Sequence, residues 1–477
     1  MIFNSIDFAI FFPIVFFTYW ILFKKNVVAR NLFLIGTSYL FYGWWDWRFL
    51  LLIILSSVVD FLVGKKIHQH ENQKVRKRWL LVSLTINLGL LGFFKYFNFF
   101  IDSFVDSFSF FGATFDGFSL KIILPVGISF YTFQTLSYTL DIYYKRLKPT
   151  KDIFAFFAFV SFFPQLVAGP IERAKKLLPQ FSSIQSVNYN AIRSGLLLMM
   201  WGFFKKIVIS DRLAIFVNNV YGDAHNADGI TAAVAMLFFA FQLYLDFSAY
   251  SDIAIGAART LGFDLSTNFK RPYLAKSFSD FWKRWHISLS EWFRDYVYIP
   301  LGGNQVSKFK VTRNILIVFL LSGLWHGASW NFVIWGGINA VFILLFDRFL
   351  SNKNNKILPR ILISVFVFST WSLSLVFFRA ESFGEAISMY GNLVTPSKQL
   401  LYEHGLNSLE FSFTIKLLGL YVVFELFLEK FKNLYSWFVG RHFIIRWFVY
   451  LLTVAFILLF GSYGVGLNDN NFIYFQF

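Results

Sequence analysis

The sequence predicts an all-α polytopic membrane protein with about 10 to 12 transmembrane helices, together with re-entrant and interfacial helices. Of its 477 residues, 57% are hydrophobic and 15% are charged, whereas soluble chains are roughly 45–50% apolar and about 25% charged. The mean hydropathy is +0.56. Apolar runs such as 315–321 and 332–346 are long and continuous, as membrane-spanning helices require.

Charge and cysteine content narrow the possible partners and chemistry. The chain has no cysteine, which excludes disulfides, thiolate metal ligands, acyl-cysteine intermediates and palmitoylation. The net charge is +17, and in a membrane chain such an excess is explained first by cytoplasmic loops and anionic lipids. We therefore expect membrane lipids as partners and no binding of nucleic acid.

Basic residues orient the first spans, because they gather on the cytoplasmic side. Residues 8–23 are followed by Lys24 and Lys25, which places the N-terminus outside, and residues 49–63 are followed by the basic run 65–78. The segment 1–7 has no basic n-region and no cleavage motif follows its apolar stretch, so we expect a retained first span. The first four crossings are predicted at 8–23, 32–41, 49–63 and 80–97.

The later chain is less regular. Residues 153–168 are apolar, but basic residues flank both ends and Pro164, Gly169 and Pro170 interrupt the helix, which predicts a re-entrant segment lining a cytoplasmic funnel. The polar, Trp-rich stretch 270–313 predicts interfacial helices. Residues 315–346 form an apolar stretch with polar and glycine interruptions. Further spans are expected near 362–378, 415–428 and 448–460, with the loop 379–412 and the Asn-rich tail 468–471 outside.

His326 is the leading candidate for chemistry. It lies 13 residues after Arg313, about 20 Å along a helix, and therefore near the middle of a hydrocarbon core about 30 Å thick. An ionisable group at that depth is costly and by default marks a site or pathway. The alternative is a neutral structural histidine between helices that pack closely through Gly323 and Gly327.

Other polar groups leave two interpretations open. His286 is either a functional histidine or an ordinary member of an amphipathic interfacial helix. Asp246 and Asp252 are either ion or proton ligands or buried partners of a basic residue. The candidate basic partners are Lys205, Lys206 and Arg212. The His and carboxylate residues lack metal-site spacing, and no P-loop, dinucleotide glycine loop or nucleophile elbow is present.

Five motifs in combination resemble the membrane-bound O-acyltransferase (MBOAT) family. They are Pro-Val-Gly-Ile-Ser-Phe-Tyr-Thr-Phe-Gln (125–134), Phe-Pro-Gln-Leu-Val-Ala-Gly-Pro-Ile (163–171), Asp-Phe-Ser-Ala-Tyr-Ser-Asp-Ile-Ala-Ile-Gly (246–256), the Trp-rich run 281–303, and Gly-Leu-Trp-His-Gly-Ala-Ser-Trp-Asn-Phe-Val-Ile-Trp-Gly (323–336). The chain is most similar to the bacterial branch of alginate and peptidoglycan O-acetylation proteins and, more distantly, to the D-alanyl transferase of teichoic acids.

The resemblance implies a ring of helices around a central funnel or tunnel. In that fold His326 matches the catalytic histidine and His286 the second histidine of the bacterial branch. It implies one integral-membrane domain over 1–477, with a motif-bearing core at about 120–345 and less diagnostic helices at 361–477. It also implies a multi-pass protein of the bacterial inner membrane, and an extracytoplasmic acyl-acceptor or transferase protein as partner.

The expected reaction is acetyl transfer from cytoplasmic acetyl-CoA, a substrate and not a bound cofactor, for O-acetylation of an extracytoplasmic polysaccharide. His326 would act as general base on the acceptor hydroxyl, because imidazole titrates near neutral pH. D-alanyl transfer to teichoic acid is one alternative, and a glycan or ion-coupled transporter is another. Seven further residues are expected to contact substrate: Gln242, Asp246, Lys283, Arg284, Arg294, Ser329 and Asn331.

Overall fold

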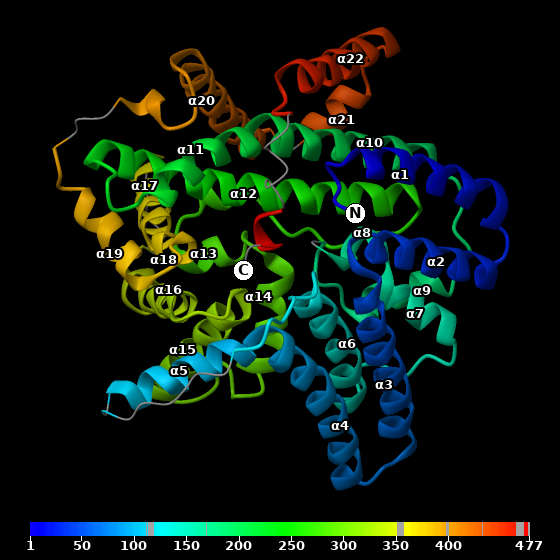
Figure 1. The fold of residues 1–477 in the computed structure, drawn as a ribbon. Helices are drawn as coiled ribbons and strands as arrows, with labels where there is room; N and C mark the ends of the chain where they lie inside the picture. The colour runs from blue at the N-terminus through cyan, green and yellow to red at the C-terminus, as the bar shows by residue number, and fades with distance from the viewer. Residues whose placement is uncertain are drawn as a thin grey trace. The chain divides into compact units, whose positions relative to one another are not determined.

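A computed structural model describes residues 1–110, 112, 119–167, 169–350, 357–396, 400–431, 433–463 and 472–475. These residues form helices and connecting turns, and none of them lies in a β-strand (Figure 1). Ala168, the last residue of the predicted re-entrant segment, and the Asn-rich tail 468–471 lie outside the described residues. The predicted all-α fold is confirmed.

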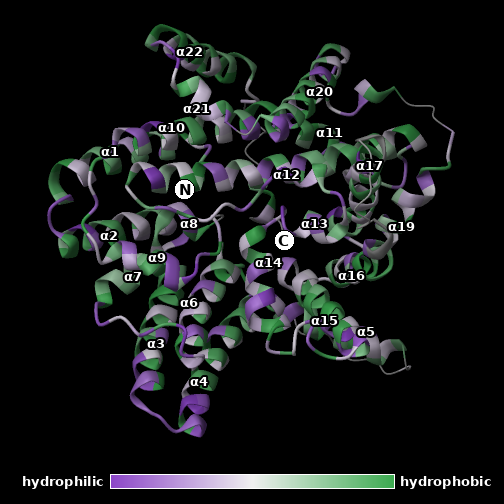
Figure 2. Ribbon diagram, turned by 180° about the vertical axis from the view of Figure 1, so that it is seen from behind, coloured by the Kyte–Doolittle hydropathy of each residue, from purple (hydrophilic) through white to green (hydrophobic). Residues whose placement is uncertain are grey.

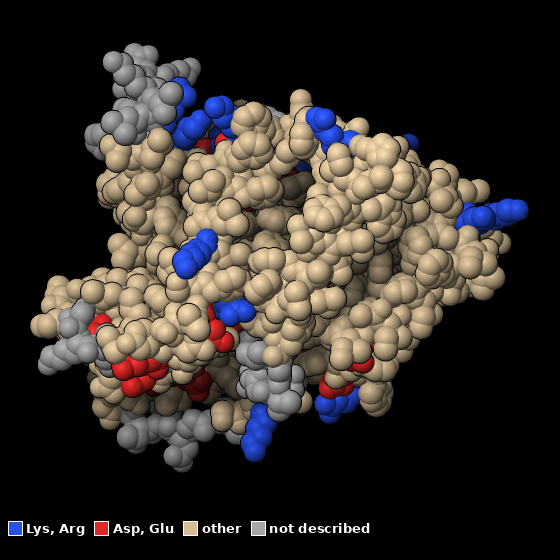
Figure 3. Space-filling model, turned by 90° about the horizontal axis from the view of Figure 1, so that it is seen from above, with Lys and Arg blue, Asp and Glu red and all other residues tan. Residues whose placement is uncertain are grey.

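Eight helical segments of the described chain are long and apolar enough to cross a membrane. The longest, Val27–Gln69, contains two helices of 20 residues each, and each of these has the length of one crossing. The eight segments are Ile6–Phe23, Val27–Gln69, Gln73–Phe110, Gly229–Thr260, Trp330–Asp347, Arg360–Arg379, Ser408–Lys430 and Phe443–Phe460. The chain is therefore a multi-pass membrane protein. On the face seen in Figure 3, charged side chains are sparse and most of the surface is uncharged.

The chain divides into two compact units. The first contains residues 1–197, 254–266 and 327–329, and the second contains residues 198–253, 267–326 and 330–477. Helices α10 (Tyr189–Phe203) and α12 (Gly229–Thr260) contribute residues to both units.

The first unit contains the N-terminal spans and the predicted re-entrant segment. Its helices are α1 (Ile6–Thr18), α2 (Val27–Asp46), α3 (Leu50–Gln69), α4 (Gln73–Leu91), α5 (Phe97–Phe110), α6 (Ile128–Tyr143), α7 (Ile153–Ser161), α8 (Phe163–Leu166) and α9 (Ala174–Phe181). Hydrophilic residues gather at the turn between α3 and α4, as the basic run 65–78 predicts (Figure 2). The predicted break near Pro164 is confirmed, since α7 ends at Ser161 and only the four-residue α8 follows.

The second unit carries both candidate histidines. Its helices are α11 (Asp211–Gly222), α13 (Phe278–Trp282), α14 (Ile287–Phe293), α15 (Lys308–His326), α16 (Trp330–Leu350), α17 (Ile357–Ser374), α18 (Val376–Arg379), α19 (Phe383–Asn392), α20 (Ser408–Lys430), α21 (Leu434–Val439) and α22 (Phe443–Phe460). A π-helical turn, η4 (Phe204–Ser210), joins α10 to α11, and a second, η6 (Arg294–Tyr298), follows α14. The C-terminal turn η9 (Ile473–Phe475) belongs to the same unit.

The stretch 270–313, predicted to form interfacial helices, contains several short helices, and Trp285, Leu289 and Trp292 within it have helical spacing in the sequence. A helix continuous through Trp285 is not observed, because His286 breaks it between α13 and α14. All three residues are nevertheless buried in the protein, at 1%, 2% and 6% exposure. A contact from a distant residue caps the N-terminal end of α13. The Asp347 carboxylate accepts hydrogen bonds from the backbone N–H groups of Phe278 and Ser279.

Helices α15 and α16 pack closely through glycine. A Cβ atom added at Gly323 would lie 2.2 Å from the Phe332 carbonyl oxygen, and one at Gly336 would lie 2.3 Å from that of Phe319. Gly323 therefore permits a backbone contact between the helices. The close helix packing expected at Gly323 is therefore present, and α16 fills the space beside this residue.

Substituting Gly323 by alanine should destabilise the protein. The new methyl group meets a backbone atom that cannot rotate away, so we expect a loss of about 1–3 kcal/mol in the free energy of unfolding. Gly337 is the matched control, because its added Cβ would find only the flexible Leu320 side chain at 3.7 Å. Thermal unfolding in detergent measures both variants. Equal stabilities of Gly323→Ala and Gly337→Ala would contradict the close packing.

Candidate active site

His326 is the last residue of α15 and is 3% exposed. The Gly-Ala-Ser sequence that follows it ends the helix, as the break predicted in the stretch 315–346 requires. Aromatic rings surround the imidazole. Ring-centroid distances are 5.1 Å to Trp325, 5.2 Å to Trp335, 5.4 Å to Phe378 and 5.6 Å to Tyr474. This aromatic enclosure limits water around His326 and strengthens electrostatic interactions there.

The second histidine lies beside the first. The ring centroids of His286 and His326 are 6.4 Å apart, although 40 residues separate them in the chain. His286 is fully buried, with the Phe247 ring edge-on at 4.7 Å, and burial lowers the pKa of its imidazole to about 3. It is therefore uncharged at neutral pH. The two histidines that the family resemblance singles out, His286 and His326, therefore lie together in one enclosed site.

The backbone of His286 is in an unusual conformation. Its φ of 42° and ψ of 54° place it in the left-handed region, where non-glycine residues are uncommon. Such conformations cost of order 1–3 kcal/mol and cluster at functional sites, where the surrounding structure enforces them. The conformation supports a functional role for His286.

The C-terminal turn brings a phenol to the histidines. The Ile473 backbone N–H donates to the Asp246 carboxylate at 2.8 Å, which fixes η9 beside α12. The next residue, Tyr474, packs on Phe247 with 4.4 Å between ring centroids and lies 6.4 Å from His286. The sequence interpretation missed Tyr474. Its only signal is the aromatic run 472–477 after a polar tail.

Two lysines neutralise the aspartates of α12. Lys206 lies 2.8 Å from both Asp246 and Asp211, and all three side chains are at most 6% exposed. Lys205 pairs with Asp252 at 2.8 Å. The π-helical turn η4 allows both lysines to face inward, although they are adjacent in sequence. Of the two interpretations of Asp246 and Asp252, the structure shows ion pairs with lysines, fully buried at Asp246 and partly exposed at Asp252.

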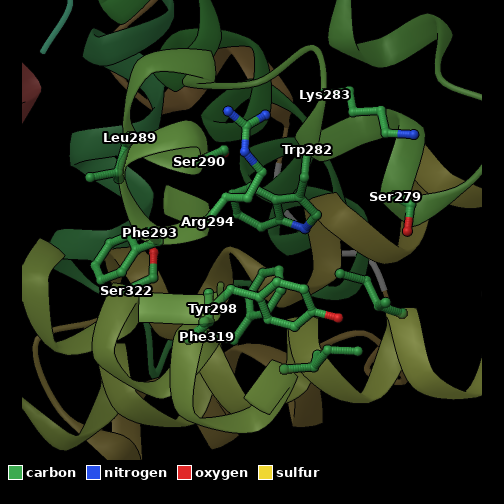
Figure 4. A pocket seen from close by; sticks show the side chains of 13 residues that line it. Ser279, Trp282, Lys283, Leu289, Ser290, Phe293, Arg294, Tyr298, Phe319 and Ser322 are labelled. Carbon is green, nitrogen blue, oxygen red and sulfur yellow. The ribbon is translucent and has the colours of Figure 1, made fainter. Parts of the chain in front are cut away.

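Two of the predicted cationic residues share a pocket of about 280 Å³ (Figure 4). Lys283 and Arg294 lie among mostly apolar side chains of α13, α14, η6 and α15, and Ser322 lines the pocket one helical turn before His326. Two indole rings link the pocket wall to the histidine, since Trp282 lines the pocket and contacts Trp335. Trp282 is 6.0 Å from Trp335, whose ring in turn contacts His326.

The remaining residues that were predicted to contact substrate do not line this pocket. Arg284 is held by Asp280 and Glu429, at 3.1 and 3.3 Å, and does not line the pocket. Gln242 is buried, and its Oε1 has no hydrogen-bond partner within the described chain. Asn331 is also buried, and its amide donates to the Ala380 carbonyl at 3.0 Å. Ser329 lies in the turn between α15 and α16.

Metal ligands were not expected from the sequence. Among the residues that the structure describes, no three His, Asp or Glu side chains are grouped so that they could hold a metal ion.

A comparison with protein-family profiles identifies the family of this chain. The profile of MBOAT, the membrane-bound O-acyltransferase family, matches residues 39–375, which include both histidines and all five sequence motifs. The chain belongs to this family and is an acyltransferase.

Proteins with similar sequences are named as O-acetyltransferases, O-acetylases or D-alanyltransferases. The chain is 37% identical over 415 residues to the peptidoglycan O-acetyltransferase of Helicobacter pylori, covering 80% of this chain and 78% of that protein. It is 39% identical over 364 residues to the probable alginate O-acetylase AlgI of Pseudomonas putida, covering 76% and 74%. The teichoic acid D-alanyltransferase of Bacillus subtilis is more distant, at 28% identity over 250 residues, covering 50% and 63%.

Proposed function

We propose that this acyltransferase moves acetyl groups from cytoplasmic acetyl-CoA for O-acetylation of an extracytoplasmic polysaccharide, with His326 as catalytic base. The observation that carries the proposal is the pair of buried imidazoles, 6.4 Å apart in an aromatic enclosure. The names of the relatives, an O-acetyltransferase of peptidoglycan and probable O-acetylases of alginate, support the acetyl group and the polysaccharide.

The chemistry requires a base because a hydroxyl is a poor nucleophile until its proton is removed. His326 takes the proton from the acceptor hydroxyl, and the oxygen attacks the thioester carbonyl. The new carbon–oxygen bond forms as the carbon–sulfur bond breaks, and the proton on His326 passes to the leaving thiolate. His286, neutral and buried, stays in the enclosure as a hydrogen-bonding partner of these groups.

The pocket beside Trp282 suits the donor. Its apolar walls fit an acyl-bearing arm, and the Lys283 and Arg294 cations suit the phosphates of CoA. Arg294 also pairs with Asp295 at 2.8 Å, so Lys283 is the stronger candidate. The Trp282 indole N–H is buried without a hydrogen-bond partner in the described residues, and a carbonyl of the donor could accept from it. Contact with lipid headgroups is the alternative role of both cations.

Tyr474 is a second candidate for the hydroxyl on which His326 acts. Burial raises the pKa of its phenol well above the ordinary value, so the phenol is protonated at neutral pH and needs a base to react. An ester on this oxygen would carry the acetyl group from the donor to the final acceptor in two steps.

Replacing Tyr474 by phenylalanine tests this role. The ring keeps its packing on Phe247, so folding should be unchanged, while transfer to the acceptor should fall at least about tenfold. Radiolabelled acetyl transfer measures the effect, and Tyr435→Phe at an exposed position is the control. Full activity of Tyr474→Phe would mean that acetyl passes directly to the external acceptor.

The proposal also covers the membrane in which the protein lies, its orientation there and its partner protein. The chain would lie in the bacterial inner membrane with its N-terminus outside, and an extracytoplasmic acceptor or transferase protein would pass the acetyl group to the polymer. A D-alanyl donor is the nearest alternative, supported by the more distant relatives. A transporter is disfavoured, because Asp246 and Asp252, its candidate coupling sites, are each paired with a lysine.

Complementation tests the function in cells. A strain lacking the gene should lose O-acetyl groups from its envelope polysaccharide, and the wild-type chain should restore them while His326→Gln should not. Ester-linked acetate and D-alanine are measured together after mild base release. Restoration of D-alanine esters without acetate would favour the alternative donor, and unchanged esters in the deletion strain would refute both.

A further inference from the structure

Asn268 holds His286 from the segment before α13. The two residues are 18 apart in the sequence, and both are fully buried in the second unit. Backbone hydrogen bonds join their segments on either side of the histidine. The Lys270 N–H donates to the Arg284 carbonyl and the Ile287 N–H to the Asn268 carbonyl, both at 2.9 Å. These bonds enforce the left-handed backbone at His286.

The side-chain amide of Asn268 can be oriented from its contacts. Its Oδ1 lies 3.2 Å from the Ser288 backbone nitrogen, 2.9 Å from the Ser288 hydroxyl and 3.2 Å from Nδ1 of His286. A backbone N–H can only donate, so the atom facing Ser288 must be the amide oxygen and not the NH₂ group. An amide oxygen only accepts hydrogen bonds. Nδ1 of His286 must therefore carry a proton and donate it to Asn268.

We infer that Asn268 is a positioning residue that fixes His286 as the Nδ1-protonated tautomer, so that Nε2 carries the lone pair. In a neutral imidazole one nitrogen donates and the other accepts, and the partner of the first decides which. His286 can then receive a proton or hydrogen bond through Nε2 but cannot donate one to a developing oxyanion. This inference rests on the proposed acyltransferase site, and it assigns His286 an accepting role there.

The tautomer can be measured without any activity assay. The full-length protein with ¹⁵N-labelled histidine in lipid nanodiscs should show a protonated Nδ1 and an unprotonated Nε2 for His286, identified by the signals lost in His286→Gln. Ser288→Ala removes one hydrogen bond to the same oxygen and should leave this pattern unchanged. A protonated Nε2 with an unprotonated Nδ1 would overturn the inference, whatever reaction the protein catalyses.

Variants of Asn268 test the consequence for turnover. Asn268→Leu keeps the approximate volume but removes the acceptor, so the tautomers should mix and kcat should fall about 10- to 100-fold, with a smaller change in KM. Asn268→Asp keeps an oxygen facing Nδ1 and should recover most of the lost turnover. If Asn268→Asp is as impaired as Asn268→Leu while both remain folded, the acceptor is not what His286 requires. If Asn268→Leu does not fold, the ¹⁵N spectrum of the wild-type protein still tests which nitrogen of His286 is protonated.

Discussion

Replacing His326 by glutamine is expected to abolish acyl transfer while leaving the protein folded. Glutamine fills similar space among Trp325, Trp335 and Phe378 and can hydrogen-bond, but its amide cannot take a proton at neutral pH. General-base catalysis contributes roughly 10²–10⁴-fold, so turnover should fall by that factor. Acetyl transfer by purified protein, with thermal unfolding alongside, measures activity and folding separately.

His68→Gln is the matched control, because His68 is exposed near the end of α3, far along the chain from the site. It should keep wild-type activity. A His326→Gln enzyme with more than about a tenth of wild-type turnover would contradict the base role, since a loss that small falls below the range for proton transfer.

Removing the Lys206 cation should give the largest loss of stability. Lys206→Met keeps the length of the side chain but leaves Asp211 and Asp246 buried together without a positive charge. Breaking a buried ion pair in this way typically costs about 3–5 kcal/mol, because the remaining charge has no compensation. Asp246 also holds the Ile473 backbone, so the C-terminal turn should detach from the histidines as the site relaxes.

Lys205→Met provides the comparison. Its partner Asp252 is 25% exposed, so water can solvate the carboxylate and the loss should be much smaller. Thermal unfolding of the two variants in the same detergent measures the difference. Equal losses, or a Lys206→Met protein as stable as wild type, would contradict the assignment of Lys206 as the cation shared by two buried aspartates.

The long elements could be predicted from the sequence because they depend on local composition. The break after His326 follows from residues 327–329, which favour a turn, and the structure ends α15 there. Lys205 and Lys206 place two charges within an apolar stretch of the sequence, and the structure has the π-helical turn η4 at this point. In both cases the signal lies within a few residues of the feature.

The parts that were not predicted depend on contacts between distant segments. Nothing local to His286 shows that the helix breaks at that residue, because Asn268 and its neighbours enforce the break from another segment. Tyr474 reaches the site through Asp246, more than 200 residues earlier in the chain. Arg284 was predicted to contact substrate, but Asp280 and Glu429 already pair with its guanidinium group. A charge in a sequence does not show its partner.

Transfer by the purified protein tests the central claim most directly. Vesicles containing the protein, supplied with radiolabelled acetyl-CoA on the side of the basic loops, should release CoA and form base-labile acetyl esters, on Tyr474 or on an added acceptor polysaccharide. His326→Gln vesicles, with the same amount of folded protein, should do neither. Ester formation that continues in His326→Gln, or its complete absence with the wild-type protein, its acceptor and its partner protein all present, would contradict the account.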